Sequence, residues 1–409
     1  MRVTSRALRT DVTPARAFST LASHARARGL PPPAMLSGDW FSSRAVLAPS
    51  LVVSPGGFPS CPEVDAPPGV IGGGWFGYLA YDDSGSLPPA AWGWADHVLR
   101  WSSSGTCYLE SVDGGGPSVS TMESLLTTAA PGSPWTAGPL RRPLPSEHRD
   151  AVKACVHAIE AGELFQANIC SRFTGSFSGS AAGLFAAGVS SMDPRRAAFL
   201  SGAWGSVVSF SPELFLARHG RSVRSTPIKG TLPRRGPDDD GNALLLRQSA
   251  KDVAENVMIT DLVRNDLGRV CEVGSVTVPS LLRVRPAPGV WHLDSTVTGT
   301  LRPSVSDADL LSASFPPGSV TGAPKIRALD LIASLEPCGR GVYTGAIGLL
   351  SPAAGLELNV AIRTFEIAAG EVSLGVGGGI TADSDPEAEW QECLHKAAPL
   401  ERLLAGVEQ

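Results

Sequence analysis

The residues best suited to take part in a chemical reaction lie in two neighbouring segments of the second half of the chain. Ser211-Pro212-Glu213 comes before an apolar run, and Pro227-Ile228-Lys229-Gly230-Thr231 follows after a short polar turn. A hairpin formed by the two segments would bring Glu213 close to Lys229. A buried lysine beside a carboxylate is either a structural ion pair or an acid paired with an amine nucleophile, and spacing alone favours the ion pair.

The chain uses arginine for most of its positive charge. It has 29 arginines and only five lysines, at positions 153, 229, 251, 325 and 396. Only lysine readily loses its proton to act as an amine nucleophile, so a lysine retained in such a chain is a candidate for chemistry. We expect Lys325 to be structural, and Lys153 and Lys251 to lie on the surface.

Acidic residues on two predicted helices could bind a metal ion. The helix predicted at 251–267 carries Glu255, and the helix predicted at 386–405 carries Glu389 and Glu392, which share a face. The glycines 377–379 before the second helix would let the backbone approach a ligand closely. Carboxylates from two helices suit a magnesium ion that keeps several waters, whereas a single Glu on an exposed helix is usually just solvated.

These residues are positioned by strands and helices that alternate irregularly. In the second half, strands are predicted at 164–176, 206–210, 274–278, 341–350, 357–366 and 371–376. Helices are predicted at 251–267, 324–335 and 386–405, with a further helix capped by Ser146 and ended by Gly162. In the first half, runs at 45–53 and 75–81 are typical of strands. The lack of a steady strand–helix repeat favours an α+β fold over a doubly wound parallel sheet.

The first 30 residues contain six arginines, which also fits a transit peptide. A helix of the folded domain is the better interpretation. Thr13 can cap it, Pro14 suits its first position, and Gly29 can end it.

Length and composition bound the remaining possibilities. The chain has 409 residues, 43% of them hydrophobic, and a net charge of −5, which argues against a broad nucleic-acid-binding surface. It has no run of about 18 apolar residues, so no membrane span is expected. We therefore expect a cytoplasmic protein that binds neither nucleic acid nor membrane. A Gly- and Pro-rich stretch at 131–145 predicts a boundary between regions 1–144 and 145–409.

Nine motifs occur in the order in which the chorismate-utilising enzyme family has them, across roughly residues 145–405. The motifs are Phe165-Gln166-Ala167-Asn168, Ser211-Pro212-Glu213, Pro227–Thr231, Glu255–Asp266, His292-Leu293-Asp294-Ser295, Gly318–Lys325, Ile362-Arg363-Thr364, the glycines 377–379 and Glu389-Trp390-Gln391-Glu392. The first half is similar to the family at Gly72–Asp82 and diverges more elsewhere. The resemblance implies an α+β fold of two large antiparallel β-sheets packed as a sandwich with helices outside, as in anthranilate synthase component I.

The resemblance also implies how a metal would be held. Glu255 and Glu392 resemble the ligands of a magnesium ion, with Glu389 close by. In the family this metal holds the ring carboxylate of chorismate. Lys396, one turn after Glu392, is expected to add positive charge beside the metal.

A second set of residues resembles the part of the family site that contacts the rest of chorismate. Tyr343 and Arg363, with the backbone amides of Gly378 and Gly379, are similar to the groups that bind the enolpyruvyl carboxylate. Ser319 resembles a hydroxyl that contacts the substrate.

Two positions distinguish members of the family. Those that add water to chorismate resemble one another in a lysine at the position of Gln166, and glutamine cannot remove a proton from water. Anthranilate synthases are similar to this chain but have a small residue in place of Lys229, which instead matches the aminodeoxychorismate synthases. The resemblance then implies that Lys229 attacks the ring at C2 while Glu213 protonates the departing C4 hydroxyl. Ammonia next displaces Lys229, and His292 assists proton transfer.

The implied activity is conversion of chorismate and ammonia to 4-amino-4-deoxychorismate, for para-aminobenzoate and folate synthesis. The chain has neither the length for a fused glutaminase nor a nucleophile-elbow cysteine between glycines, so we expect ammonia from a separate glutamine amidotransferase subunit. An anthranilate synthase large subunit is the alternative within the family. A catalytically inactive subunit that binds a partner or chorismate is an alternative of another class. Met35–Trp40 departs from the Leu-Leu-Glu-Ser-like motif on which tryptophan feedback depends, so that feedback is not expected.

Overall fold

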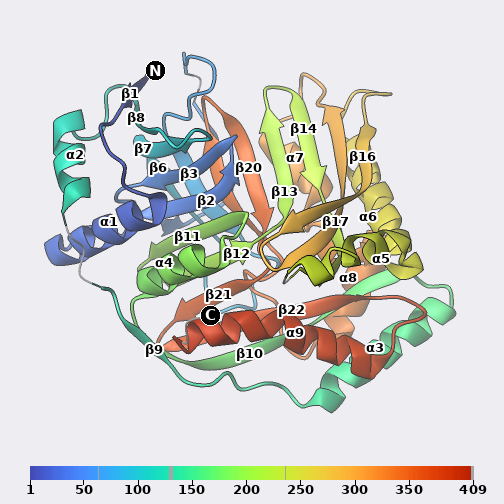
Figure 1. The fold of residues 1–409 in the computed structure, drawn as a ribbon. Coiled ribbons are helices and arrows are strands. Elements are labelled where there is room, and N and C mark those ends of the chain that lie inside the picture. The colour runs from blue at the N-terminus through green and yellow to red at the C-terminus, as the bar shows by residue number, and fades with distance from the viewer. Residues whose placement is uncertain (63, 129–131, 235, 407–409) are drawn as a thin grey trace.

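The computed structural model describes residues 1–62, 64–128, 132–234 and 236–406. Within these residues the strands form two antiparallel sheets, one of twelve strands and one of ten. The sheets pack face to face, and helices cover their outer faces (Figure 1). The predicted α+β sandwich with helices outside is confirmed.

The larger sheet spans most of the length of the chain. Its strands are β1 (Val3–Ala7), β2 (Ala34–Trp40), β3 (Ser43–Ala48), β7 (His97–Ser102), β8 (Cys107–Val112), β9 (Trp135–Ala137), β10 (Gln166–Gly179), β11 (Arg196–Gly202), β12 (Gly205–Ser211), β18 (Gly322–Ala323), β21 (Thr364–Ala368) and β22 (Glu371–Ile380). Their order in space is β1-β8-β7-β3-β2-β11-β12-β21-β22-β10-β18, with β9 also paired to β10.

The smaller sheet is built in the same way from distant segments. Its strands are β4 (Ser54–Pro55), β5 (Gly74–Leu79), β6 (Ala90–Ala95), β13 (Leu214–His219), β14 (Ser222–Thr226), β15 (Ile228–Pro233), β16 (Thr277–Ala287), β17 (Val290–Thr300), β19 (Ala346–Ser351) and β20 (Gly355–Val360). Their order is β15-β17-β14-β13-β20-β19-β5-β6-β4, with β16 also paired to β17.

Helices pack on the outer face of each sheet. The α-helices are α1 (Pro14–Arg28), α2 (Val119–Thr127), α3 (Pro145–Glu160), α4 (Ala181–Met192), α5 (Asn242–Gln248), α6 (Ala250–Gly268), α7 (Asp307–Ser314), α8 (Lys325–Leu335) and α9 (Pro386–Leu404), and the short 3-10 helices are η1 (Pro237–Asp239) and η2 (Gly318–Val320). Apolar residues of α1, α2, α4 and α9 pack on the larger sheet, and those of α6 and α7 on the smaller one.

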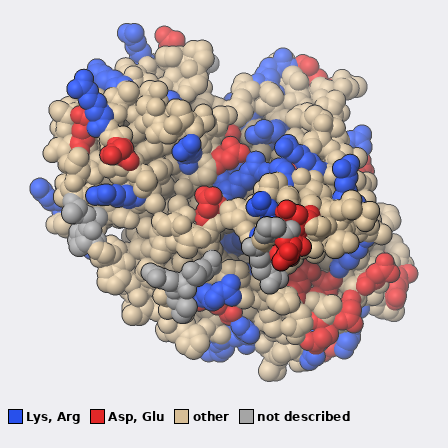
Figure 2. Space-filling model, viewed as in Figure 1, with Lys and Arg blue, Asp and Glu red and all other residues tan. Residues whose placement is uncertain are grey.

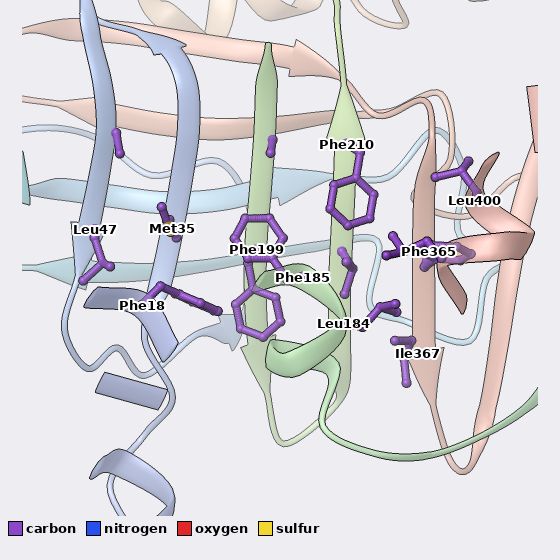
Figure 3. Packing of buried hydrophobic residues seen from close by; sticks show 14 of the residues in the cluster. Phe18, Met35, Leu47, Leu184, Phe185, Phe199, Phe210, Phe365, Ile367 and Leu400 are labelled. Carbon is purple, nitrogen blue, oxygen red and sulfur yellow. The ribbon is translucent and has the colours of Figure 1, made fainter. Parts of the chain in front are cut away.

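Alternation of side chains along the strands separates the core between the sheets from the core under the helices. In β2, Met35 packs under the helices and Leu36 packs between the sheets, as the two-residue repeat of a strand requires. Figure 3 shows the helix side, where Phe18 of α1 lies against Phe185 and Phe199. The ring centroids of Phe18 lie 5.1 Å and 5.2 Å from those two partners, an edge-to-face packing that adds to the apolar burial.

Helix α1 matches the predicted signals at both ends. The Thr13 side chain accepts a hydrogen bond from the backbone N–H of Arg16, and Pro14 occupies the first turn. Gly29 ends the helix with φ 63°, a conformation that favours glycine. The residues at 14–28 therefore form a domain helix packed on the larger sheet.

The two predicted regions share both sheets. β2 of the first region pairs with β11 of the second, and β5 pairs with β19. The predicted linker at 131–145 contributes β9, which pairs with β10, while its residue 131 lies outside the described residues. The boundary near residue 145 thus separates two stretches of sequence that contribute strands to the same sheets.

Several predicted boundaries were wrong in detail. α3 begins at Pro145, and its N-cap is Leu144, not Ser146. Proline suits the first helical position, and the apolar side chain of Leu144 makes no capping hydrogen bond. The strands predicted at 274–278 and 341–350 begin later, at Thr277 and Ala346. The single strand predicted at 357–366 is two strands, β20 and β21, in different sheets. None of the described helices combines the length and apolar composition needed to cross a bilayer.

Candidate active site

Two crossovers between the sheets lie side by side and carry Glu213 and Arg363. Glu213 lies between β12 of the larger sheet and β13 of the smaller one, and Arg363 lies between β20 and β21. The Val360 N–H donates to the Glu213 carbonyl at 3.1 Å, and the Phe210 N–H donates to the Arg363 carbonyl at 3.0 Å. Arg363 has φ 52°, which breaks the strand at the point of crossing. A site here draws side chains from both sheets.

Glu213 is buried and receives hydrogen bonds from uncharged donors. The Ile228 N–H donates to its Oε1 at 3.4 Å, and the Ser319 hydroxyl is a second partner. Burial raises the pKa of Glu213 to about 7, although both hydrogen bonds and the charge of Lys229 lower it. A carboxyl with a pKa near neutrality keeps a proton in much of the population at pH 7 and can act as a general acid.

The closeness of Glu213 and Lys229 arises from a different pairing than the one predicted. β13 forms its hairpin with β14, where Leu214 lies opposite Thr226, and β15 pairs with β17 instead. Pro227 separates β14 from β15 because it has no N–H to continue the ladder. The two motifs therefore meet at the end of a hairpin and not across it.

Gly379 on β22 lies at the centre of one polar group of side chains. A Cβ added there would lie 2.4 Å from Gln166 Nε2, 2.8 Å from Lys229 Nζ and 3.0 Å from Glu255 Oε2. Lys229 Nζ and Glu255 Oε2 are themselves 3.8 Å apart. β15, α6 and β10 thus converge on one glycine, whose missing side chain leaves the space between them.

Gly378 has the same relation to the residues of α9. A Cβ added there would lie 3.1 Å from Glu389 Oε2, 3.8 Å from Glu392 Oε1 and 3.9 Å from Lys396 Nζ. Lys396 Nζ lies 2.7 Å from Glu392 Oε1 and donates to the Gly377 carbonyl at 2.8 Å. The three glutamates predicted as metal ligands therefore all face this pair of adjacent glycines.

Each of these glutamates is paired with a lysine. The third pair is Lys251 and Glu389, with Nζ 2.9 Å from Oε1. Lys251 lies on the surface, as predicted, and its side chain reaches inward to this buried carboxylate. We call these six residues the lysine–glutamate cluster: Lys229, Lys251, Lys396, Glu255, Glu389 and Glu392. Its formal charges balance.

The cluster provides the donors that magnesium prefers. Glu389 Oε2 is buried without a hydrogen-bond partner among the described residues, although Oε1 of the same carboxylate is bonded. Carboxylate oxygens are hard ligands suited to Mg²⁺. In the described part of the chain no three His, Cys, Asp or Glu side chains already enclose a metal position, so Glu255, Glu389 and Glu392 would have to turn toward an ion. The carboxylate oxygens are therefore of the chemical type that Mg²⁺ requires.

Burial and the lysine charges act against each other on the carboxylates of the cluster, and the net shift of the pKa differs between Glu255 and Glu392. Burial raises the pKa of Glu255, against the lowering effect of Lys229 and Lys251. Burial also opposes ionisation of Glu392, but Lys396, Lys251 and Lys229 together hold the pKa of Glu392 below its usual value.

His292 belongs to a separate, basic part of the site. It lines a cavity of about 330 Å³ together with Arg195, Arg285 and Arg363. Its Nδ1 lies 3.0 Å from Thr231 Oγ1, and its Nε2 is buried with no partner in the described residues. Burial and the charges of Arg363 and Arg195 lower the pKa of His292 to about 3, so it is neutral at pH 7. Figure 2 shows Lys and Arg side chains gathered in the central recess of this face.

The remaining predicted residues lie around these groups. Ser319, in η2, is buried and bonded to Glu213. Tyr343 packs its ring against Gly375 of β22, where an added Cβ would lie 2.1 Å from the ring, and its hydroxyl is 4.0 Å from Cys170 Sγ. Burial raises the pKa of Tyr343 well above its usual value, so its hydroxyl remains a donor.

Two residues of the site were not among the predicted site residues. Gln166 has a buried Oε1 with no hydrogen-bond partner in the described residues. Lys251 lies four residues before Glu255 in α6, a spacing that places both on one helix face. That spacing was a usable signal for Lys251. The free oxygen of Gln166 depends on tertiary packing, which no local pattern specifies.

Comparison with known proteins agrees with this arrangement. Residues 59–402 match the family described as chorismate binding enzyme. The chain belongs to this family. The family match crosses residue 145, as both sheets do.

The chorismate-binding family includes relatives of more than one named activity. Aminodeoxychorismate synthase component 1 of Escherichia coli is 42% identical over 254 residues, which cover 61% of this chain and 55% of that protein. Anthranilate synthase component 1 of Streptomyces coelicolor is 47% identical over 194 residues, covering 47% of this chain and 38% of that protein. The matched segment is thus only about half of the length of the E. coli relative.

A solved structure supports the fold assignment. Anthranilate synthase component I of Streptococcus pneumoniae superposes with a TM-score of 0.70 at 28% identity, covering 81% of each chain.

Proposed function

We propose that this protein is the large subunit of an aminodeoxychorismate synthase, which converts chorismate and ammonia to 4-amino-4-deoxychorismate and water. The observation that carries the proposal is the position of Lys229. Its Nζ lies beside Glu255 and above Gly379, and the adjacent Ile228 N–H is bonded to Glu213. The charge of Lys229 also acts on Glu213, which supports an amine nucleophile and a carboxylic acid that act on one substrate.

The first half of the reaction forms a bond from Lys229 to the ring. The neutral amine attacks C2, the electron pair of C1=C2 moves to C1–C6, that of C5=C6 moves to C4–C5, and the C4–O bond breaks. Glu213 gives its proton to the departing oxygen, which leaves as water. A pKa near 7 suits Glu213 for this step because it holds a transferable proton at neutral pH.

The second half reverses these shifts. Ammonia attacks C4, the two electron pairs return, and the C2–N bond to Lys229 breaks, so the lysine leaves as a neutral amine. The new ammonium group returns one proton to the Glu213 carboxylate. Both protein groups are then restored, and the enolpyruvyl group stays on the ring.

The other residues bind and orient the substrate. Glu255, Glu392 and Glu389 would hold a magnesium ion, which when bound supplies positive charge for the ring carboxylate. Arg363, Tyr343 and the amides of Gly378 and Gly379 would hold the enolpyruvyl carboxylate, with Ser319 against the substrate. His292 is neutral and its Nε2 has no partner among the described residues, so this nitrogen can exchange a proton beside the ring.

Ammonia is expected from a separate glutamine amidotransferase subunit. The name component 1 of the E. coli relative is consistent with a further subunit. The purified chain should therefore use ammonium and ignore glutamine. Turnover of glutamine by rigorously purified protein would contradict this part of the proposal.

An anthranilate synthase large subunit is the second candidate, and the identity to the S. coelicolor protein favours it. The two are separated by incubating the protein with chorismate, MgCl2 and ammonium and identifying the product. A non-aromatic amine that retains the enolpyruvyl group supports the proposal. Fluorescent anthranilate would replace it with the second candidate.

The covalent step has its own test. With chorismate present and ammonia excluded, intact-protein mass spectrometry should show a ring adduct, and peptide mapping should place it on Lys229. Lys229→Arg keeps the charge but does not deprotonate, so it should be nearly inactive. Normal turnover by Lys229→Arg, with no adduct in the parent protein, would remove the covalent mechanism.

A further inference from the structure

Lys251 has an unusual place in the lysine–glutamate cluster. It lies in the first turn of α6, and its side chain is 41% exposed, yet its Nζ reaches Glu389, whose side chain is 3% exposed. Glu389 Oε1 also accepts the Ser384 hydroxyl at 2.6 Å, while its Oε2 has no partner among the described residues. A buried carboxylate is therefore neutralised by a lysine that extends inward from the surface.

The three lysines of the cluster differ in how firmly they are held. Lys396 is bonded both to Glu392 and to the Gly377 carbonyl. Lys229 is 10% exposed and lies in a strand. Among the described residues Lys251 Nζ has one hydrogen bond, to Glu389. Its side chain is about as exposed as that of Lys396, 41% against 43%, but it lacks the second bond that Lys396 makes to the Gly377 carbonyl. It is the lysine that can leave with the least disruption.

The charge of Lys251 also reaches the other two glutamates. It acts on both Glu255, one turn along the same helix, and Glu392. A divalent ion entering the cluster would meet three carboxylates whose charge three lysines already balance. Binding of the ion is favourable only if positive charge moves away, because like charges at short range repel strongly in a partly buried site.

We propose that Lys251 is a displaceable counter-ion: it pairs with Glu389 when the cluster holds no metal and releases that carboxylate to Mg²⁺ when the ion binds. Lys251 is a positioning residue in this scheme and touches no reacting atom. The inference rests on the proposed magnesium site. It adds that the lysine competes with the metal and so sets the affinity of the site.

The test compares Lys251→Met with the parent protein and with Lys153→Met. Lys153 is an exposed lysine of α3 that pairs with Asp150, which makes it a matched control. Binding of MgCl2 alone is measured by titration calorimetry, and melting temperatures are measured with and without MgCl2.

Without metal, Lys251→Met should melt lower because Glu389 loses its partner. It should bind Mg²⁺ roughly tenfold more tightly because the competing charge is gone. Addition of MgCl2 should raise its melting temperature more than that of the parent.

The outcomes separate failure of the Lys251 inference from failure of the proposed magnesium site. If the parent binds Mg²⁺ and Lys251→Met binds it equally or more weakly, Lys251 is not displaced and the inference is wrong. If the parent binds no Mg²⁺, the metal site fails and the inference fails with it. If Lys251→Met does not fold without metal, Lys251→Gln replaces it, since glutamine can still donate to Glu389 while removing the charge. Lys251→Gln should show the same gain in Mg²⁺ affinity, and an unchanged affinity would again reject the inference.

Discussion

Two buried glutamates in this molecule, Glu213 and Glu389, have similar exposure and opposite surroundings. They are 3% and 2% exposed. Glu213 is bonded to the Ser319 hydroxyl and the Ile228 N–H, which are uncharged, whereas Glu389 is bonded to the Lys251 ammonium and the Ser384 hydroxyl. Both carboxyl groups are buried, so the difference between them comes from the groups to which they are hydrogen-bonded. Glu213 is suited to give up a proton, and Glu389 to face a cation.

The largest expected effect is that of Glu213→Gln. Glutamine keeps the size of the side chain and cannot protonate the leaving oxygen, so turnover of chorismate with ammonium should fall by about 10²–10⁴-fold. Chorismate binding, measured by calorimetry, should change little. Activity within a few-fold of the parent would mean that another group supplies the proton, and the contrast between Glu213 and Glu389 would lose its meaning for catalysis.

The next largest effect is expected on Mg²⁺ affinity, when one of the proposed glutamate ligands is replaced. Glu392→Gln removes one ligand charge, so its apparent affinity for Mg²⁺ in the ammonium-dependent assay should fall by roughly 100-fold, and Glu255→Gln should behave likewise. The matched control is Glu387→Gln, on the same helix but paired with the exposed Arg149. Circular dichroism should show that all three variants fold. Normal activity of Glu392→Gln at limiting magnesium would reject the ligand assignment.

Much of this arrangement was predictable from the sequence because it depends on short motifs. The lysine at 229, the acid at 213 and the glutamates on two helices each belong to a local pattern with a chemical meaning. The pairing was not predictable in the same way. The contact of Glu213 with Ile228 depends on a proline that ends β14, and the position of Arg363 depends on a crossover inside what had the pattern of one continuous strand.

Strand pairing in the first region, residues 1–144, could not be predicted from the sequence either. Its strands enter sheets whose other strands lie up to several hundred residues away, as with β5 and β19. Alternating apolar residues specify that a strand has a buried face, but they do not specify its neighbour. The pairing across residue 145 therefore became visible only in the structure. The α+β class followed from the irregular order of strands and helices, and the two-sheet sandwich followed from the family resemblance.

A smaller effect is expected from a substitution at Gly379, around which Gln166, Lys229 and Glu255 converge. Gly379→Ala places a methyl group within 3.0 Å of Gln166, Lys229 and Glu255. These side chains must shift, and misplacing reacting groups should lower kcat/KM for chorismate on the order of tenfold. Gly268→Ala is the control, since a Cβ at Gly268, at the end of α6, would meet nothing within 4 Å. Equal activity of both variants would mean that the space at Gly379 is not used by substrate.

The smallest effect is on stability and depends on pH. The pKa of Glu213 is about 7 in the folded protein against an ordinary value of 4.5, so the folded state binds this proton more tightly than the unfolded state does. The contribution of this group to stability is then complete below about pH 4.5 and is lost as pH rises to about 7. Glu213→Gln has no such proton to lose. Relative to the parent, its free energy of unfolding should therefore increase by about 2 to 3 kcal/mol between pH 5 and pH 8. Urea unfolding at the two pH values measures the difference. Glu387→Gln should show no such gain, because the hydrogen bonds of Gln391 and Arg149 lower the pKa of Glu387. If the difference between Glu213→Gln and the parent is the same at both pH values, Glu213 does not carry a raised pKa, and the acid role assigned to it loses its physical basis.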